Sequence, residues 1–142
     1  MALQSLPAQL PKSQADWERF VNVMQGWQQQ IQAPQWRAAT LLNGWTNYGA
    51  GWATAGYLED VNGRVWLKGL VTGGTLSSAL FQLPHGGAYR HMFPAPCAAG
   101  GTAPVLARID IDTSGNVILE ETALSGAVGW LSLDGISFGP NS

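Results

Sequence analysis

Two aspartates, a serine and a glutamate in the last third of the chain have the spacing of a calcium-binding loop. Asp110, Asp112 and Ser114 occupy positions 1, 3 and 5 of such a loop, followed by Gly115 at position 6 and Glu121 at position 12. The flanking residues, however, alternate between apolar and polar like β-strands, whereas an EF-hand requires a helix on each side. We therefore favour a hairpin turn that uses Asp and Ser for turn chemistry, and we predict no metal ligands here.

Two histidines and the single cysteine lie close together in the sequence. His85 and His91 flank a Gly-rich segment, and Cys97 follows directly after Pro96. A Cys–His pair can act as nucleophile and base, but the sequence places no Asn or Asp partner beside this pair. We interpret Cys97 as a packed side chain and His91 as a loop residue that contacts a ligand. The alternative applies if the chain forms a trimer. Three copies of one histidine around the threefold axis could then hold a metal ion.

The remaining acidic residues do not predict an enzyme. Glu59 and Asp60 are adjacent, as are Glu120 and Glu121, and neighbours on a strand point to opposite faces of a sheet. Such pairs cannot flank one glycosidic bond. The Gly49-x-Gly51 run also lacks the spacing of a dinucleotide-binding loop. We expect neither catalysis nor a cofactor.

Aromatic residues are the better candidates for a binding surface. The 142-residue chain has 7 tryptophans, 3 tyrosines and 4 phenylalanines. Tyr48, Trp52 and Tyr89 lie in or beside Gly-rich, loop-like segments, where exposed rings suit stacking on sugars. These three residues and His91 are our candidate ligand-binding residues, and we expect Trp66 and Trp130 to pack in the core or against another subunit.

Composition excludes several classes of protein. Only 7 residues are Lys or Arg and the net charge is −2, so the chain cannot neutralise a run of phosphates, and we expect no nucleic-acid partner. One cysteine excludes an intrachain disulfide framework. No stretch of 18 apolar residues would span a membrane, and the N-terminus does not resemble a signal peptide.

Residues 13–33 have the pattern of a helix that associates with copies of itself. Ser13 is a candidate N-cap with Asp16 in the first turn, and Pro34 ends the helix. Apolar residues then repeat with spacings of 3, 4, 3 and 4, as in a heptad seam: Trp17, Phe20, Met24, Trp27 and Ile31. Two heptads are also compatible with packing against the chain's own domain. We favour a bundle of three or more helices.

The rest of the chain has the pattern of short antiparallel strands. Strand-like runs occupy residues 36–42, 52–59, 65–71, 78–83, 105–111, 117–121, 128–133 and 136–138. Asn62-Gly63 between two of these runs predicts a hairpin. Residues 84–103, rich in Gly and Pro, read as a loop with a short strand near residues 90–93. Many short strands with Gly-rich turns predict a mainly β fold, an antiparallel sandwich or barrel.

One long stretch resembles the β-sandwich heads of tailed-bacteriophage fibre and receptor-binding proteins. The shared run has the form NGW-x-NYG-x-G-[YW]-x-x-A-x-Y, here residues 43–57, followed by a hairpin and V-x-L-x-G-L at residues 65–70. A Leu-Pro at a strand end, an Ala-Arg-Ile-Asp strand and a closing run over residues 130–138 follow in the same order. The similarity extends over about residues 36–140.

This resemblance implies a trimeric, jelly-roll-like β-sandwich head on a virion appendage. Residues 1–12 would then be an arm that docks on other virion proteins, residues 13–33 the helical stalk, and residues 34–142 the head. The head would bind a host-surface receptor, and we expect a polysaccharide. The alternatives are a structural decoration or collar trimer and, third, a glycan depolymerase.

Overall fold

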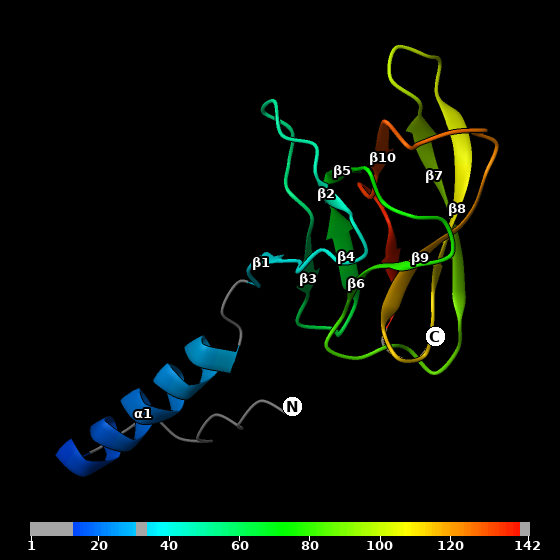
Figure 1. The fold of residues 1–142 in the computed structure, drawn as a ribbon. Helices are drawn as coiled ribbons and strands as arrows, with labels where there is room; N and C mark the ends of the chain where they lie inside the picture. Colours follow the sequence, from blue (N-terminus) through cyan, green and yellow to red (C-terminus); the bar gives the residue numbers. More distant parts are fainter. Residues whose placement is uncertain (1–12, 31–33, 140–142) are drawn as a thin grey trace. The chain divides into compact units, whose positions relative to one another are not determined.

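The computed structural model describes residues 13–30 and 34–139 of the chain. The chain divides into two compact units, Met1–Pro34 and Gln35–Ser142, and we call the second unit the head. The arm predicted for residues 1–12 and the seam residue Ile31 lie outside the described residues. Figure 1 shows the helix α1, which belongs to the first unit, and the strands of the head.

The helix α1 (Gln14–Gln30) begins as its sequence predicts. The hydroxyl of Ser13 accepts a hydrogen bond from the backbone N–H of Asp16 at 3.1 Å, which confirms the N-cap. Trp17 and Phe20 lie edge to face, with ring centroids 5.9 Å apart. Half of the Trp17 side chain and nearly half of Val21 are exposed (51% and 46%), so this unit carries an uncovered apolar stripe.

The head is built from two antiparallel sheets. The first has four strands in the order β1 (Arg37–Ala38), β3 (Gly56–Glu59), β4 (Val65–Lys68) and β11 (Ser137–Phe138). The second has seven strands in the order β2 (Thr46–Asn47), β5 (Leu70–Thr72), β10 (Trp130–Ser132), β7 (His91–Ala98), β8 (Val105–Ile111), β9 (Asn116–Thr122) and β6 (Ala79–Gln82). These sheets confirm the mainly β, antiparallel class.

One hydrophobic core joins the inner faces of both sheets. Val65 and Leu67 contribute to it from the four-stranded sheet, and Ile109 and Leu119 from the seven-stranded sheet. In β4 the buried Val65 and Leu67 alternate with the more exposed Trp66 and Lys68, as expected for a sheet with one solvated face. A two-layer arrangement with the core between the layers fits a β-sandwich.

The predicted hairpin at Asn62-Gly63 is confirmed. β3 and β4 pair from Gly56–Lys68 to Glu59–Val65, and one carboxylate oxygen of Asp60 accepts the backbone N–H groups of Asn62 and Arg64 at 2.9 Å each. The predicted strand over residues 65–71, however, is two strands. Gly69, with φ of 118°, lies between β4 and β5 and transfers the chain from one sheet to the other.

The predicted strand over residues 36–42 is also shorter than expected, because this segment bridges the two sheets. Only Arg37 and Ala38 form a strand. Farther on, Ala39 bonds to the carbonyl of Ala55, beside the four-stranded sheet, and Leu42 bonds to that of Leu80 in the seven-stranded sheet. Because successive hydrogen bonds of this segment go to two different sheets, it does not form a continuous strand pairing with either one.

The short strand predicted near residues 90–93 is present but longer than predicted: it is β7, the longest strand, and it continues to Ala98, where a loop was predicted (Figure 1). Pro94 and Pro96 suggested a loop because proline cannot donate to a ladder. They stand opposite Arg108 and Leu106 of β8, while β10 on the other side pairs with Cys97 and Ala98. The prolines thus lie beyond the β10 contact, where a missing N–H is tolerated.

Candidate functional site

The outer face of the seven-stranded sheet carries the residues of the best candidate site. Leu131 and Leu133 are buried, so the residues between and beside them point outward: Trp130, Ser132 and Asp134. Ser132 stands opposite Leu70 of β5, and Trp130 stands opposite Ala98 of β7. Side chains from three neighbouring strands therefore meet on one surface.

These residues line a cavity that we call the aromatic groove. Its volume is about 370 Å³, and seven residues line it: Tyr48, Trp52, Leu70, Pro96, Trp130, Ser132 and Asp134. The size lies within the range of small-molecule sites. Three aromatic side chains in one groove are an arrangement that stacks on flat, apolar ligand faces.

A tight turn places Tyr48 and Trp52 over the sheet. The backbone N–H of Tyr48 donates to Leu70 at 2.9 Å, and Leu70 donates to Ala53 at 3.0 Å, so both ends of the turn are fixed to β5. Between them, Gly49, Ala50 and Gly51 all have positive φ values of 77°, 53° and 85°. Three successive left-handed residues reverse the chain sharply, which explains the two glycines at this point.

The groove has one carboxylate in its lining. Asp134 Oδ1 accepts the backbone N–H of Gly69 at 2.9 Å, and the backbone N–H of Asp134 donates to the Ser132 hydroxyl at 3.3 Å. These bonds fix the polar edge of the groove relative to the sheet crossing at Gly69. A carboxylate and a hydroxyl beside aromatic rings can bind the hydroxyl groups of a ligand whose apolar face stacks on the rings.

The structure brings together two of the four predicted ligand residues. Tyr48 and Trp52 share the groove, with 41% and 61% of their surfaces exposed. Tyr89 is 68% exposed but does not line the groove. His91 stacks on Phe138 with ring centroids 5.5 Å apart, so its ring packs at the edge of the core.

Five groove residues were not predicted as ligand residues, among them the outward-facing Trp130, Ser132 and Asp134. Trp130, which we expect to pack in the core or against another subunit, is partly exposed in the single chain and lines the groove. The alternation Trp130-Leu131-Ser132-Leu133-Asp134 places the two leucines on one face and the other three residues on the opposite face. This two-residue alternation in the sequence could have identified the three outward-facing residues as members of one surface.

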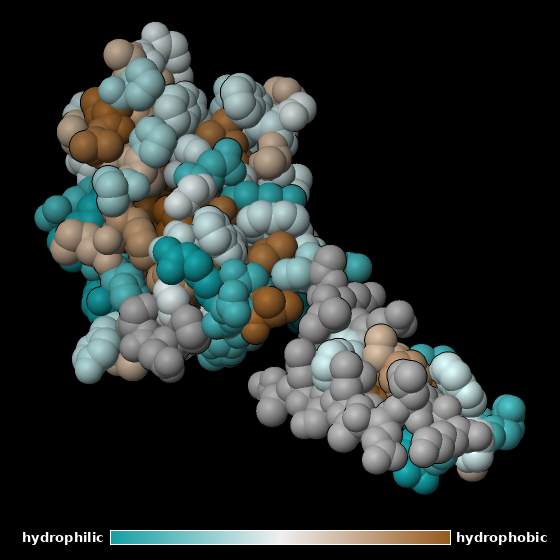
Figure 2. All heavy atoms as spheres, turned by 180° about the vertical axis from the view of Figure 1, so that it is seen from behind, coloured by the Kyte–Doolittle hydropathy of each residue, from teal (hydrophilic) through white to brown (hydrophobic). Residues whose placement is uncertain are grey.

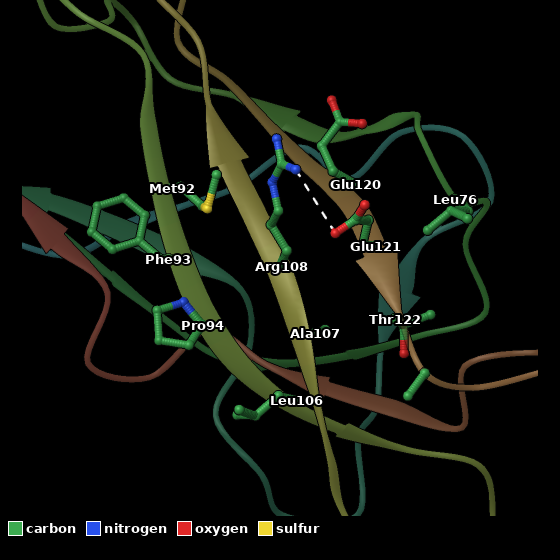
Figure 3. Close-up of a pocket in the computed structure, with 11 residues that line it drawn as sticks. Leu76, Met92, Phe93, Pro94, Leu106, Ala107, Arg108, Glu120, Glu121 and Thr122 are labelled. Carbon is green, nitrogen blue, oxygen red and sulfur yellow. Dashed lines mark ion pairs between the residues drawn. The ribbon is translucent and has the colours of Figure 1, made fainter.

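A second hollow lies farther along the same sheet, over β7, β8 and β9 (Figure 3). Its volume is about 640 Å³, and its apolar residues include Met92, Leu106 and Leu76, which are 63%, 70% and 49% exposed. Arg108 Nη1 lies 3.8 Å from Glu121 Oε2, and Figure 3 marks this ion pair with a dashed line. The hollow combines exposed apolar side chains with a weak ion pair, as surfaces that contact other proteins do.

The calcium-loop residues form a turn, as we favoured. Asp112 Oδ1 accepts the backbone N–H groups of Ser114 and Asn116 at 2.9 Å each, and Oδ2 accepts the Asn116 side-chain amide at 2.9 Å. Burial raises the pKa of Asp112, but the hydrogen bonds from Asn116 and Ser114 outweigh it and leave the pKa below its ordinary value. Both carboxylate oxygens are thus occupied within the turn.

Asp110 is engaged by two arginines. Its Oδ1 accepts Arg108 Nε at 2.8 Å, and its Oδ2 accepts Arg90 Nε at 3.1 Å and Arg108 Nη2 at 2.8 Å. Arg90 also bonds to Glu120 at 2.7 Å. The hydrogen bonds from Arg108, aided by its charge and by Arg90, lower the pKa of Asp110 in spite of burial. This network attaches the segment before β7 to the sheet.

The remaining candidates for chemistry do not converge. Within residues 13–30 and 34–139, no three His, Cys, Asp or Glu side chains gather in a way that could hold a metal ion. Cys97 is buried, and its Sγ lies 3.2 Å from the hydroxyl of Thr122. His85 Nε2 lies 3.1 Å from Glu59 at the surface.

Apolar side chains also reach the surface outside the two hollows. Figure 2 shows hydrophobic residues in separate patches among polar ones on the face in view. Over the described ranges, we find no helix with the length and apolarity needed to cross a membrane.

Comparison with known proteins identifies the fold. No protein-family model matches the sequence, and no curated protein matches it. Among solved structures, the crystal structure of the receptor binding protein (gp15) of Listeria phage PSA is similar, with a TM-score of 0.63 and 20% identity. The alignment covers 88% of this chain and 76% of that one. The chain therefore shares its fold with a phage receptor binding protein.

Proposed function

We propose that this protein is a bacteriophage virion component whose head binds a receptor on the host cell surface, and that the receptor is a polysaccharide. The observation that carries the proposal is the aromatic groove, in which Tyr48, Trp52 and Trp130 lie beside Ser132 and Asp134. Sugar rings have apolar faces that stack on aromatic side chains and hydroxyls that bond to polar ones. The shared fold with a phage receptor binding protein supports the same role.

Binding without catalysis is part of the proposal. The seven residues of the groove include one carboxylate, Asp134, whereas most glycosidases use a pair of carboxyl groups across the scissile bond. Its hydrogen bond from Gly69 suits a fixed acceptor rather than a proton donor.

A homotrimer is the expected state, docked on other virion proteins through residues 1–12. Support comes from the apolar stripe of α1 and from Met92 and Leu106, whose exposure leaves them available for subunit contacts. Three weak groove sites on one particle would bind together through avidity.

The test is a binding measurement with Trp52→Ala in the full chain, using intact host cells and an array of purified glycans. We expect at least a tenfold loss of binding, because removing a stacked ring costs about 1.4 kcal/mol or more. Tyr89→Ala is the matched control, since Tyr89 is also exposed and aromatic but lies outside the groove.

Other outcomes identify the alternatives. Unchanged adsorption in both variants would favour a structural decoration or collar protein. Loss in Tyr89→Ala alone would place the binding site on the loop before β7. Release of reducing ends from host polysaccharide would show a depolymerase and contradict the non-enzymatic proposal.

A further inference from the structure

The outer face of the four-stranded sheet carries two cations, each stacked on a tryptophan. Arg64 Cζ lies 5.4 Å from the centroid of the Trp66 ring, and Lys68 Nζ lies 4.8 Å from that of Trp36. Arg64, Trp66 and Lys68 alternate with the buried Val65 and Leu67, so all three occupy the outer face. We call Trp36, Arg64, Trp66 and Lys68 the cation–tryptophan strip.

A glycine leaves room for this arrangement. Gly56 stands opposite Lys68 in the β3–β4 ladder, and a Cβ on Gly56 would come within 3.3 Å of Lys68 Cε and 2.8 Å of the Arg37 carbonyl oxygen. The lysine stem thus passes over a position without a side chain toward Trp36. Any larger residue at position 56 would displace this stem or the β1 backbone.

Neither cation of the strip has an ion-pair partner among the described residues, although Asp60 lies near enough to Arg64 for the two charges to attract. Among the described residues, no carboxylate oxygen lies within 4.0 Å of the Arg64 or Lys68 charge, whereas Arg90 and Arg108 both have acidic partners. Asp60, the nearest acid in the sequence, accepts the N–H groups of Asn62 and Arg64 with one oxygen and Trp66 Nε1 with the other. Arg64 donates to the hydroxyl of Ser137, which carries no charge.

We propose that the cation–tryptophan strip is a second binding site, and that it takes an acidic polysaccharide carrying carboxylate groups. The Cα atoms of Arg64 and Lys68 are about 13 Å apart along one extended segment. Their charged groups lie over two different tryptophans, so each can meet a separate carboxylate of one polymer. The partly exposed Trp36 and Trp66 rings beside them contact the sugar rings. The strip lies on the opposite sheet from the aromatic groove, so it goes beyond the function proposed above.

A saccharide fits this strip better than a nucleic acid does. A nucleic acid carries one phosphate at every nucleotide. This chain has 7 Lys and Arg residues and a net charge of −2, which is too little positive charge to neutralise such a run of phosphates. Two separated cations suit a polymer in which sugar rings separate the charges.

The test is calorimetric titration of the full chain with oligogalacturonate at low salt, with dextran oligomers of equal length as the neutral probe. We expect binding of the acidic oligomer only, weakened by added salt. Lys68→Ala should weaken it about fivefold, the size of one partly exposed ion pair. Near-ultraviolet circular dichroism of each variant confirms that the head is folded.

Arg37→Ala is the matched control, because Arg37 is an exposed cation of the same sheet that alternates with Trp36 and so points away from the strip. We expect less than a twofold change. Equal losses for Lys68→Ala and Arg37→Ala would mean a general charge effect and overturn the proposal, as would absent binding or equal binding of dextran. Tighter binding of single-stranded DNA of equal charge would assign the strip to nucleic acid instead. Trp52→Ala should not change this titration, so failure of the groove proposal and failure of this one are distinguishable.

Discussion

At the scale of single residues, Asp110 is the clearest case of a charge that the fold has to stabilise. It is 1% exposed and lies on the outer side of β8, under two arginine side chains. An unpaired carboxylate there would be costly, but three hydrogen bonds from guanidinium groups compensate its desolvation. The two arginine side chains remain partly exposed and cover the buried carboxylate on the outer face of the sheet.

Replacing this carboxylate tests the network. Asp110→Asn keeps the shape of the side chain but removes the charge that both arginines face, and we expect it to lower the free energy of unfolding by about 2 kcal/mol. Urea denaturation at neutral pH measures this. Glu121→Gln is the control, because its pair with Arg108 is longer, 3.8 Å, and 74% of the Glu121 side chain is exposed; the expected change is below about 1 kcal/mol.

The same carboxylate predicts a pH dependence. Its pKa is lower in the folded protein than the ordinary value of about 3.9, so its contribution is complete above that value and is lost as the pH falls through the folded-state pKa. The wild-type free energy of unfolding should therefore fall as the solution is acidified below about pH 4. In Asp110→Asn, the free energy of unfolding should depend less steeply on pH in this range. An equally steep dependence in both proteins would contradict the assignment of this pH dependence to Asp110.

At the scale of elements, Gly69 decides where one sheet ends and the other begins. Its φ of 118° suits glycine, and a Cβ there would lie 2.5 Å from Ala55 Cα and 2.6 Å from Ala55 N. The next residue, Leu70, lines the aromatic groove, and the backbone N–H of Gly69 donates a hydrogen bond to the carboxylate of Asp134, which also lines it. The sheet crossing and the groove thus depend on the same residue.

Gly69→Ala should be strongly destabilising. Backbone strain and the clash with Ala55 together cost about 2–5 kcal/mol. Thermal unfolding followed by circular dichroism measures the loss. Gly126→Ala is the comparison, since nothing lies within 4 Å of a Cβ at that position; a similar loss in both variants would show that glycine content alone, and not the crossing, is responsible.

Local signals in the sequence predicted the elements whose stabilising contacts are also local. The N-cap at Ser13 and the Asn62-Gly63 hairpin depend on residues within a few positions of each other. β8 was predicted with the observed bounds, because its alternation matches one buried and one outer face. In β7, by contrast, the pairing with β8 prevails over the prolines, and only the tertiary structure supplies that information.

The groove was only half predictable for the same reason. Tyr48 and Trp52 belong to a Gly-rich turn that the sequence marks as unusual, but Trp130 comes from a strand more than seventy residues away. Pairing of β10 with both β5 and β7 brings them together, and strand order cannot be read from periodicity.

At the scale of the whole molecule, exposed apolar side chains predict self-association. The heptad seam predicts a bundle of three or more helices, and the proposed trimer would have a mass of three times 15.1 kDa, which light scattering of the full chain measures directly. Phe20→Glu places a charge in the seam and should dissociate the trimer. Gln25→Glu, an exposed position of the same helix, should leave it intact.

The outcome separates the contributions of the two units. A monomer at micromolar concentration in the unaltered chain would contradict the bundle. A trimer that persists in Phe20→Glu would mean that the heads associate on their own, through a surface such as the hollow with Met92 and Leu106.

The burial of Cys97 gives this chain a built-in chemical reporter of its own opening. It is the one cysteine of the sequence, it is 0% exposed, and it lies where β7 pairs with both β8 and β10. A thiol reagent can modify it only in molecules whose central strands have separated. In the purified protein, the rate of Cys97 modification therefore reports how readily the central strands of the head separate.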